Sequence, residues 1–250
     1  MKYSIVITTF DKRFESDLIP LLNSIKALRP KMEVILMING PGRANFDQEY
    51  RSKLLSFIAG HNAVYPTIFP TFQSLAKLWN RGILTSSNER VLILNDDLKI
   101  HLEDGKSFFD EFELAFMSAP DTFTINGSFS HFGVSKKEVI EVGFFDERLL
   151  GLGEEDGDFF WRYHEKFNRE IPNLEISLID NIHSDVTDDG YVKGIRTASK
   201  FNREFIKKQK YQDILFGGYK GMFDKRAKKI LSDEAQYPYE NFYLENKNRL

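Results

Sequence analysis

The sequence contains no cysteine, and this absence limits the chemistry available to the protein. Disulfide bonds and thiolate-bound metal ions are both excluded, so stability has to come from packing. The 250 residues are enough for that, because a domain near this size buries roughly three quarters of its unfolded surface. The lack of cysteine also favours a reducing compartment.

Long apolar runs are missing as well. No stretch of the sequence approaches the ~20 apolar residues that span a bilayer. The first three residues lead into a strand-like segment and show no signal-peptide pattern. We therefore expect a cytoplasmic protein.

The net charge is only −3, but residues 200–229 carry ten Lys or Arg against three Asp or Glu. One interpretation is a solvated helical face. The other is peripheral contact with the anionic inner face of a membrane, with an apolar side made of Phe205, Ile206, Tyr211, Ile214, Leu215 and Phe216. Because the chain as a whole is acidic and has no base-reading motif, we expect no nucleic-acid partner.

Strand-like and helix-like segments alternate along the first half. Strands are expected at 3–9, 32–38 and 90–94, helices at 18–28, 45–59, 71–84 and 104–118, and a loop at Pro66 and Pro70. This alternation predicts an α/β fold with a mostly parallel central sheet flanked by helices.

The second half is less regular. Strands are expected near 122–126, 129–134 and 176–179, and helices from Lys136 and from about Glu155. Residues 184–194 are polar and rich in Gly and Asp, which predicts a mobile loop able to close over a ligand. The chain looks helical from Thr197 onward. We expect a catalytic domain at 1–196 with a basic, helical appendage at 197–250 packed on it.

Asp96 and Asp97 directly follow a buried strand. Ligands of open parallel sheets bind at the carboxyl ends of the strands. Two aspartates there would repel an anionic nucleotide unless a hard divalent cation bridged the carboxylate and phosphate oxygens. The alternative is a solvated turn, since Asn-Asp-Asp is good turn chemistry.

The segment 151–158 places four acids within five positions, among three glycines, at an expected helix start. Stabilisation by the helix dipole is the simple explanation. However, crowding raises the pKa of neighbouring carboxyls, which can leave one of them basic enough to accept a proton. Glycines would also let an acceptor approach the backbone closely. We favour a functional role for this segment.

His183 follows an expected strand and precedes the polar loop. A lone histidine can be an ordinary surface or core residue. Together with Asp97, however, it would complete a metal site in which imidazole favours Mn²⁺ over Mg²⁺.

These features, in this order, resemble the GT-A superfamily of glycosyltransferases, especially the inverting family 2 type. The resemblance spans roughly residues 3–185 and is carried by Ile5–Lys12, Val34–Gly40, Leu78–Ile83, Leu94–Asp97, Val142–Glu147 and Gly151–Arg162. Leu94–Asp97 resembles the DXD-type metal motif. The last block is also similar to the Gly-Gly-Glu-Asp segment of β-1,4-galactosyltransferases.

The resemblance implies a role for each matching residue. Asp156 would be the general base and Glu155 would bind the acceptor sugar. Asp97 and His183 would hold Mn²⁺ or Mg²⁺. The donor would be bound by Thr8, Phe10, Asn39, Arg81 and Asp96. Two positions depart from the family pattern: Ile38 replaces the usual second-strand Asp and Trp79 replaces the usual Arg. UDP remains the default nucleotide.

The implied activity is an inverting hexosyltransferase that moves a sugar from a UDP-sugar to a saccharide or lipid-linked acceptor, as in polysaccharide biosynthesis. A nucleotidyltransferase on a related sheet is one alternative. Those enzymes typically have a glycine-rich loop after the first strand, and Thr9–Arg13 contains no glycine. A non-catalytic sugar- or nucleotide-binding module is the other. A retaining reaction is a smaller third possibility.

Overall fold

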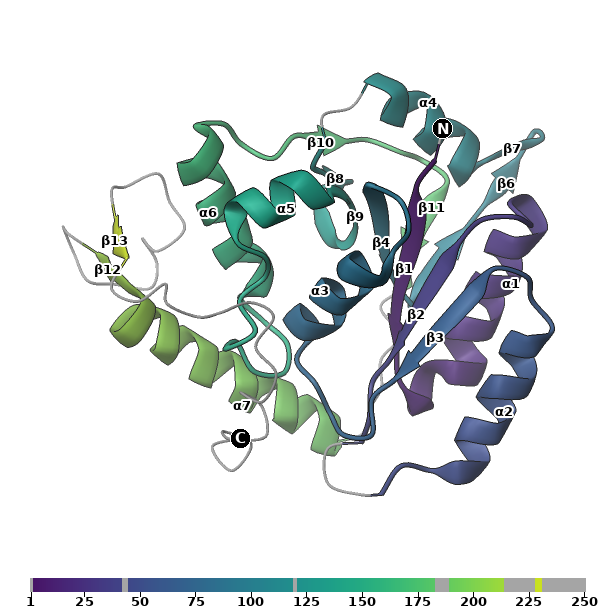
Figure 1. The fold of residues 1–250 in the computed structure, drawn as a ribbon, viewed down its shortest axis with the longest axis horizontal. Helices are drawn as coiled ribbons and strands as arrows, with labels where there is room; N and C mark the ends of the chain where they lie inside the picture. The colour runs from purple at the N-terminus through teal and green to yellow at the C-terminus, as the bar shows by residue number, and fades with distance from the viewer. Residues whose placement is uncertain (1, 42–44, 119–120, 183–188, 214–227, 231–250) are drawn as a thin grey trace. The chain divides into compact units, whose positions relative to one another are not determined.

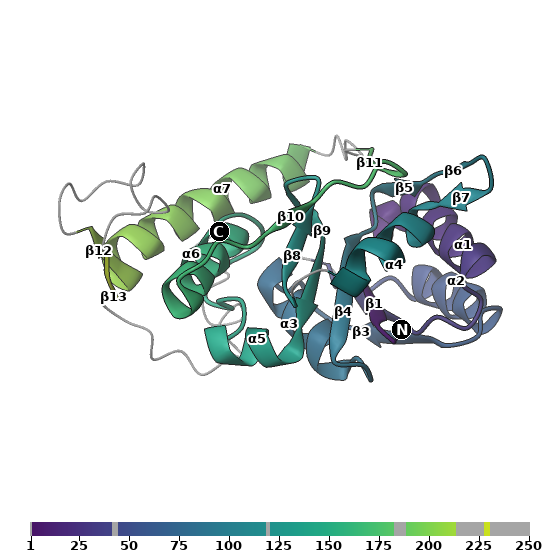
Figure 2. The same cartoon turned by 90° about the horizontal axis from the view of Figure 1, so that it is seen from above.

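The computed structural model describes residues 2–41, 45–118, 121–182, 189–213 and 228–230 (Figures 1 and 2). The chain forms two compact units, neither of them continuous in sequence. Unit 1 comprises Met1–Phe72, Arg81–Val139 and Ile171–Asp185, and unit 2 comprises Gln73–Asn80, Ile140–Glu170 and Val186–Leu250. The division into a catalytic part at 1–196 and an appendage at 197–250 stays a prediction.

Unit 1 contains a seven-stranded sheet in the order β10-β8-β9-β4-β1-β2-β3. Its strands are β1 (Ser4–Thr9), β2 (Val34–Ile38), β3 (Val64–Ile68), β4 (Arg90–Asn95), β8 (Phe123–Ile125), β9 (Ser128–Ser135) and β10 (Asn173–Leu174). Only β9 runs against its neighbours β4 and β8, and the other six strands are parallel to one another. The predicted mostly parallel α/β sheet is confirmed.

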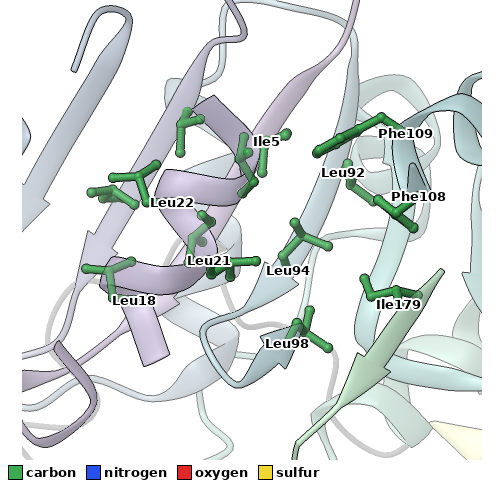
Figure 3. Packing of buried hydrophobic residues seen from close by; sticks show 14 of the residues in the cluster. Ile5, Leu18, Leu21, Leu22, Leu92, Leu94, Leu98, Phe108, Phe109 and Ile179 are labelled. Atoms are coloured by element: carbon green, nitrogen blue, oxygen red, sulfur yellow. The ribbon is translucent and has the colours of Figure 1, made fainter. Parts of the chain in front are cut away.

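Every residue of β1 and β2 is buried, as their β-branched and apolar composition predicts for central parallel strands. One face of the sheet packs against α1 (Ile19–Leu28), α2 (Gln48–Ala59) and α4 (Phe108–Ser118). Figure 3 shows leucines of α1 and phenylalanines of α4 packed with Ile5, Leu92 and Leu94 of the strands. This core fixes the strand ends that carry the site.

The opposite face of β1 meets α3 (Leu75–Thr85). A Cβ added to Gly82 of α3 would lie 2.3 Å from a Val6 methyl carbon. Glycine at this position therefore lets the helix backbone approach the strand.

Two short antiparallel pairs complete unit 1. β5 (Leu98–Ile100) pairs with β11 (Ile179–Asn181), and β6 (Leu102–Glu103) pairs with β7 (Lys106–Ser107). The strand that was expected at 176–179 is found at Ile179–Asn181, so only its last residue was predicted correctly. The pairing of β5 with β11 holds the chain after Ile179 alongside the residues that follow Asp97.

Pro66 lies inside β3, so the loop predicted there is wrong at this residue. Proline cannot donate to a strand ladder and is tolerated on edge strands. β3 is the last strand of the sheet and pairs only with β2.

Unit 2 holds α6 (Glu155–Phe167), α7 (Asp189–Phe205), the π-helical turn η3 (Ile206–Lys210), and the pair β12 (Tyr211–Asp213) with β13 (Lys228–Ile230). The boundaries of the two units fall within α3 and within α5 (Lys136–Val142). The loop predicted at 184–194 is wrong for 189–194, which belong to α7, and 184–188 lie outside the described residues. The glycine and aspartate residues there predicted a loop, but residues 189–194 form the first turns of the longer helix α7.

The core of unit 2 combines apolar side chains with buried charges. Leu149, Trp161, Phe205, Ile206 and Tyr211 pack together. The prediction that Phe205, Ile206 and Tyr211 form an apolar, membrane-facing side is therefore wrong, because all three are buried in this core. The other three residues of that expected side lie outside the described residues.

Lys210 is completely buried between two aspartates that are also completely buried. Its Nζ lies 2.6 Å from Asp146 Oδ2 and 2.7 Å from Asp158 Oδ1. Arg148 also pairs with Asp146 at 2.8 Å, and Arg162 with Asp158 at 2.9 Å. One cation of the basic stretch 200–229 is therefore a core residue and not part of a membrane-facing surface.

None of the helices in the described residues has the length and apolarity that crossing a membrane requires. Membrane contact through 200–229 and a cytoplasmic location stay predictions.

Lys210→Met is expected to destabilise the protein by about 3 kcal/mol, because removing one partner of a buried ion pair leaves charge uncompensated. Arg148 and Arg162 still face the two aspartates, which puts the loss at the lower end of the usual range. Urea unfolding measures it. The control is Lys208→Met, since Lys208 is exposed and pairs with Glu204 on the surface. Equal unfolding free energies for the two variants would contradict the structural role of Lys210.

Candidate functional site

Asp96 and Asp97 lie at the carboxyl end of β4 and are buried, with exposures of 2% and 7%. A third residue joins them: Arg13 Nη1 lies 2.9 Å from Asp96 Oδ1 and 3.1 Å from Asp97 Oδ2. Arg13 ends the short helix η1 (Asp11–Arg13) that follows β1. Because β1 and β4 are parallel neighbours, their carboxyl ends meet at one edge of the sheet.

The charges of this cluster are incompletely satisfied. Burial raises the pKa of Asp96 to about 7, against the lowering effect of Arg13. Asp96 Oδ2 and Asp97 Oδ1 are buried and have no hydrogen-bond partner among the described residues. Carboxylate oxygens are the hard ligands that Mg²⁺ and Mn²⁺ prefer. The donor set at this strand end therefore fits a divalent cation.

The predicted donor residues Thr8, Phe10 and Asn39 lie at the carboxyl ends of β1 and β2, next to this cluster in the sheet. Thr8 Oγ1 donates to Asn95 Oδ1 at 3.4 Å, and the Phe10 ring centre lies 5.4 Å from the guanidinium carbon of Arg13. The Asn39 N–H donates to the Thr9 carbonyl at 2.8 Å. The structure thus brings five predicted donor and metal residues to three adjacent strand ends.

Two residues of the segment Leu78–Ile83, which carries part of the family resemblance, have packing roles. Asn80 is fully buried, donates through Nδ2 to the Phe145 carbonyl and Glu147 Oε1, and accepts from the Phe145 N–H. Trp79 is buried with its ring centre 5.0 Å from that of Phe145. Arg81 is half-buried on α3, and its predicted contact with the donor stays a prediction.

His183 lies outside the described residues. The residue before it is placed: the Ile182 N–H donates to the Asp97 carbonyl at 2.9 Å. The described stretch 121–182 thus includes the residue next to His183, and this residue is hydrogen-bonded to the predicted metal ligand. Among the described residues, no group of three His, Cys, Asp or Glu side chains is arranged to hold a metal ion.

The acidic segment forms a strained turn at the start of α6. Gly151, Gly153 and Glu154 have φ angles of 62°, 115° and 77°. A Cβ on Gly151 would lie 2.8 Å from the Ala198 Cβ. The backbone conformation and the packing of α7 therefore explain these two glycines, which were expected to make room for an acceptor.

Two of the four acids form ion pairs in the described part of the chain and the other two do not. Glu154 pairs with Arg203 at 2.8 Å, and Asp158 pairs with Arg162 and Lys210. Within the described residues, Glu155 and Asp156 have no ion pair. The two acids left without a cation are those that the sequence singled out.

Glu155 and Asp156 nevertheless differ in their surroundings. Glu155 is buried, and its Oε2 accepts the Gly153 N–H at 2.6 Å. Burial, together with Asp156, raises the pKa of Glu155 to about 8, which favours the protonated carboxyl at neutral pH. Asp156 is half-buried, and burial raises its pKa as well. A more accessible carboxylate of raised pKa is suited to accept a proton.

Sequence reasoning missed Arg13, Lys210 and Tyr211. Tyr211 donates through its hydroxyl to Asp158 Oδ1 at 2.6 Å, and the two residues are 53 positions apart. No local pattern signals such a pair. Arg13 was within reach, because neighbouring parallel strands bring its turn and Asp96 to the same edge.

No family model matches the sequence, and no curated protein matches it. Solved structures of S. aureus TarS do match. One TarS structure gives a TM-score of 0.53 at 16% identity, covering 72% of this chain and 36% of that one. TarS 1–349 gives 0.52 at 13% identity, covering 84% and 75%.

Complexes of TarS 1–349 with UDP and with UDP-GlcNAc each give a TM-score of 0.50 at 12% identity, covering 82% of this chain and 66% and 67% of theirs. The chain thus spans little more than a third of the longer TarS chain, at 36% of its length. At this identity the likeness shows the fold, which is GT-A-like. The likeness to β-1,4-galactosyltransferases stays a prediction.

Glu155→Gln is expected to change how stability depends on pH. The folded protein keeps the Glu155 proton up to about pH 8, whereas the unfolded chain releases it near the ordinary value of 4.5. Between these values wild-type stability falls as pH rises, by up to ~1.4 kcal/mol per pH unit from this group. The glutamine variant lacks this slope, so its stability relative to wild type should grow from pH 5 to 8.

Urea unfolding at several pH values measures this difference. The matched control is Glu165→Gln, an exposed position on the same helix, whose stability should follow wild type at every pH. A stability difference between Glu155→Gln and wild type that stays constant across the range would refute the raised pKa.

Proposed function

We propose that the protein is a metal-dependent inverting glycosyltransferase of the hexosyltransferase type. It moves a sugar from a nucleotide sugar, with UDP as the nucleotide, to a saccharide or lipid-linked saccharide. The observation that carries the proposal is the buried Asp96–Asp97 pair at the carboxyl end of β4, in a sheet whose fold matches TarS 1–349, a protein solved with UDP and with UDP-GlcNAc.

Unit 1 supplies the donor residues. Thr8, Phe10 and Asn39 lie at neighbouring strand ends, where open parallel sheets bind nucleotides. In this proposal they contact the base and ribose, while Arg81 and Asp96 contact the rest of the donor. One aromatic and two polar residues at neighbouring strand ends suit a nucleoside.

Asp97 and His183 are the proposed ligands of Mn²⁺ or Mg²⁺. Two observations support this assignment. Asp97 Oδ1 has no hydrogen-bond partner among the described residues, and the N–H of Ile182, the residue before His183, donates a hydrogen bond to the Asp97 carbonyl. A divalent cation there would neutralise the donor diphosphate and stabilise it as a leaving group. His183 and the donor's phosphate oxygens would supply the ligands that the described residues lack.

Residues at the start of α6 are proposed to supply the acceptor chemistry. The Asp156 carboxylate takes the proton of the acceptor hydroxyl while the acceptor oxygen bonds to the anomeric carbon and the bond from that carbon to the diphosphate oxygen breaks. Attack opposite the leaving group inverts the configuration. Because burial favours the protonated form of Glu155, we assign it the role of hydrogen-bond donor to the acceptor sugar, and not that of the base.

Asp156→Asn is expected to lower sugar transfer about 10²- to 10⁴-fold, the usual contribution of general base catalysis. UDP affinity should be unchanged, since the amide keeps the size of the side chain. Product formation with a UDP-sugar and calorimetry with UDP measure the two quantities. Asp104→Asn, at an exposed turn, serves as the control. Transfer by Asp156→Asn close to the wild-type rate would remove Asp156 from its role.

Asp97→Asn is expected to weaken Mn²⁺-dependent UDP binding at least about tenfold, since an amide oxygen carries no charge to hold the cation. Calorimetry with UDP in Mn²⁺ and in excess chelator tests this. Wild-type and Asp104→Asn proteins should both lose affinity in chelator, whereas Asp97→Asn should change little. Unaltered wild-type binding in chelator would contradict the metal role.

A further inference from the structure

Arg13 contacts both members of the acidic pair, Asp96 and Asp97, and Asp97 is the proposed metal ligand. A single nitrogen, Nη1, lies within 3.1 Å of an oxygen from each aspartate. The side chain is only 14% exposed. Its own N–H donates to the Phe10 carbonyl at 3.1 Å, and its guanidinium lies near the Phe10 ring. The turn after β1 therefore delivers a positive group onto the acidic pair.

The guanidinium neutralises the pair only in part. It brings one positive charge to two buried carboxylates, and one oxygen of each stays without a hydrogen bond among the described residues. A divalent cation would bring two charges and bind several oxygens. The Arg13 guanidinium and a metal ion bound to the same carboxylates would also repel each other. The two cations therefore cannot both occupy the acidic pair.

A donor diphosphate offers the guanidinium a second partner. Arginine binds phosphate oxygens through two parallel hydrogen bonds, which makes phosphate a strong competitor for it. The Arg13 turn lies at the carboxyl edge of the sheet, where a nucleotide would bind.

We propose that Arg13 is a built-in competitor for the metal ion and that the donor diphosphate releases it. In the donor-free protein the guanidinium holds Asp96 and Asp97. When the nucleotide sugar binds, Arg13 turns to the diphosphate, which leaves Asp97 available to hold the metal ion and Asp96 to contact the donor. This inference rests on the proposed function and adds a consequence: metal and donor bind cooperatively, because each removes an obstacle to the other.

Mn²⁺ titration followed by electron paramagnetic resonance tests the proposal by direct binding, without turnover. Wild type, Arg13→Gln, Arg13→Lys and Lys99→Gln are compared with and without UDP, correcting for Mn²⁺ held by free UDP. Lys99 is exposed and lies two residues from Asp97, so its glutamine variant loses the same charge without the contact.

Without UDP, Arg13→Gln should bind Mn²⁺ about tenfold tighter than wild type, since a competing charge on the ligands is gone. Arg13→Lys should lie between them, because an ammonium bridges two carboxylates less firmly than a guanidinium. Lys99→Gln should match wild type. UDP should tighten Mn²⁺ binding by a larger factor in wild type than in Arg13→Gln. Circular dichroism checks that each variant folds.

Equal Mn²⁺ affinity in wild type and both Arg13 variants would overturn the competition and leave the metal site intact. An equal UDP effect in wild type and Arg13→Gln would overturn the release step. If no protein in the series binds Mn²⁺ even with UDP, the metal-dependent function itself fails, and the role of Arg13 fails with it. The failure of this inference is thereby distinguishable from the failure of the proposed function.

Discussion

A buried ionised carboxylate needs positive charge nearby, and the ion pairs that supply it organise both units. In unit 1, Arg13 reaches Asp96 and Asp97 from the turn after the neighbouring strand. In unit 2, Lys210 lies between Asp146 and Asp158 with no exposure to solvent. An ionised carboxylate without such a partner would shift its pKa and become neutral. These ion pairs therefore hold together segments that are far apart in sequence.

Among the described residues, two sets of carboxyl oxygens lack a full set of cationic or hydrogen-bond partners. Both sets belong to residues that are assigned a role in the proposed function. Asp96 and Asp97 keep one unpartnered oxygen each despite Arg13. Glu155 and Asp156 have no ion pair within the described residues, although both neighbouring acids do. Structural needs account for Asp146, Glu154 and Asp158 but leave these four side chains unexplained. A metal ion would supply a partner for the oxygens of Asp96 and Asp97, and an acceptor hydroxyl would supply one for Glu155 and Asp156.

The sequence predicted most of the sheet and the placement of the acids. Runs of β-branched and other apolar residues predict β1, β2 and β4, and the end of β4 determines the position of Asp96 and Asp97. Other features depend on distant partners. Lys210 lies 64 residues from Asp146, so its charge suggested a basic surface until the structure showed it buried. Pro66 is tolerated only because β3 is an edge strand, and the helix over 189–194 overrides a local loop signal.

Release of UDP from UDP-glucose, UDP-galactose and UDP-GlcNAc by the purified wild-type protein tests the central claim most directly. In the presence of Mn²⁺, at least one of these donors should yield UDP, by slow hydrolysis alone and faster with a saccharide acceptor, and chelator should stop the release. A protein that binds UDP but releases none from any donor, with or without acceptor, would be a binding module on a GT-A-like fold and would contradict the proposed activity.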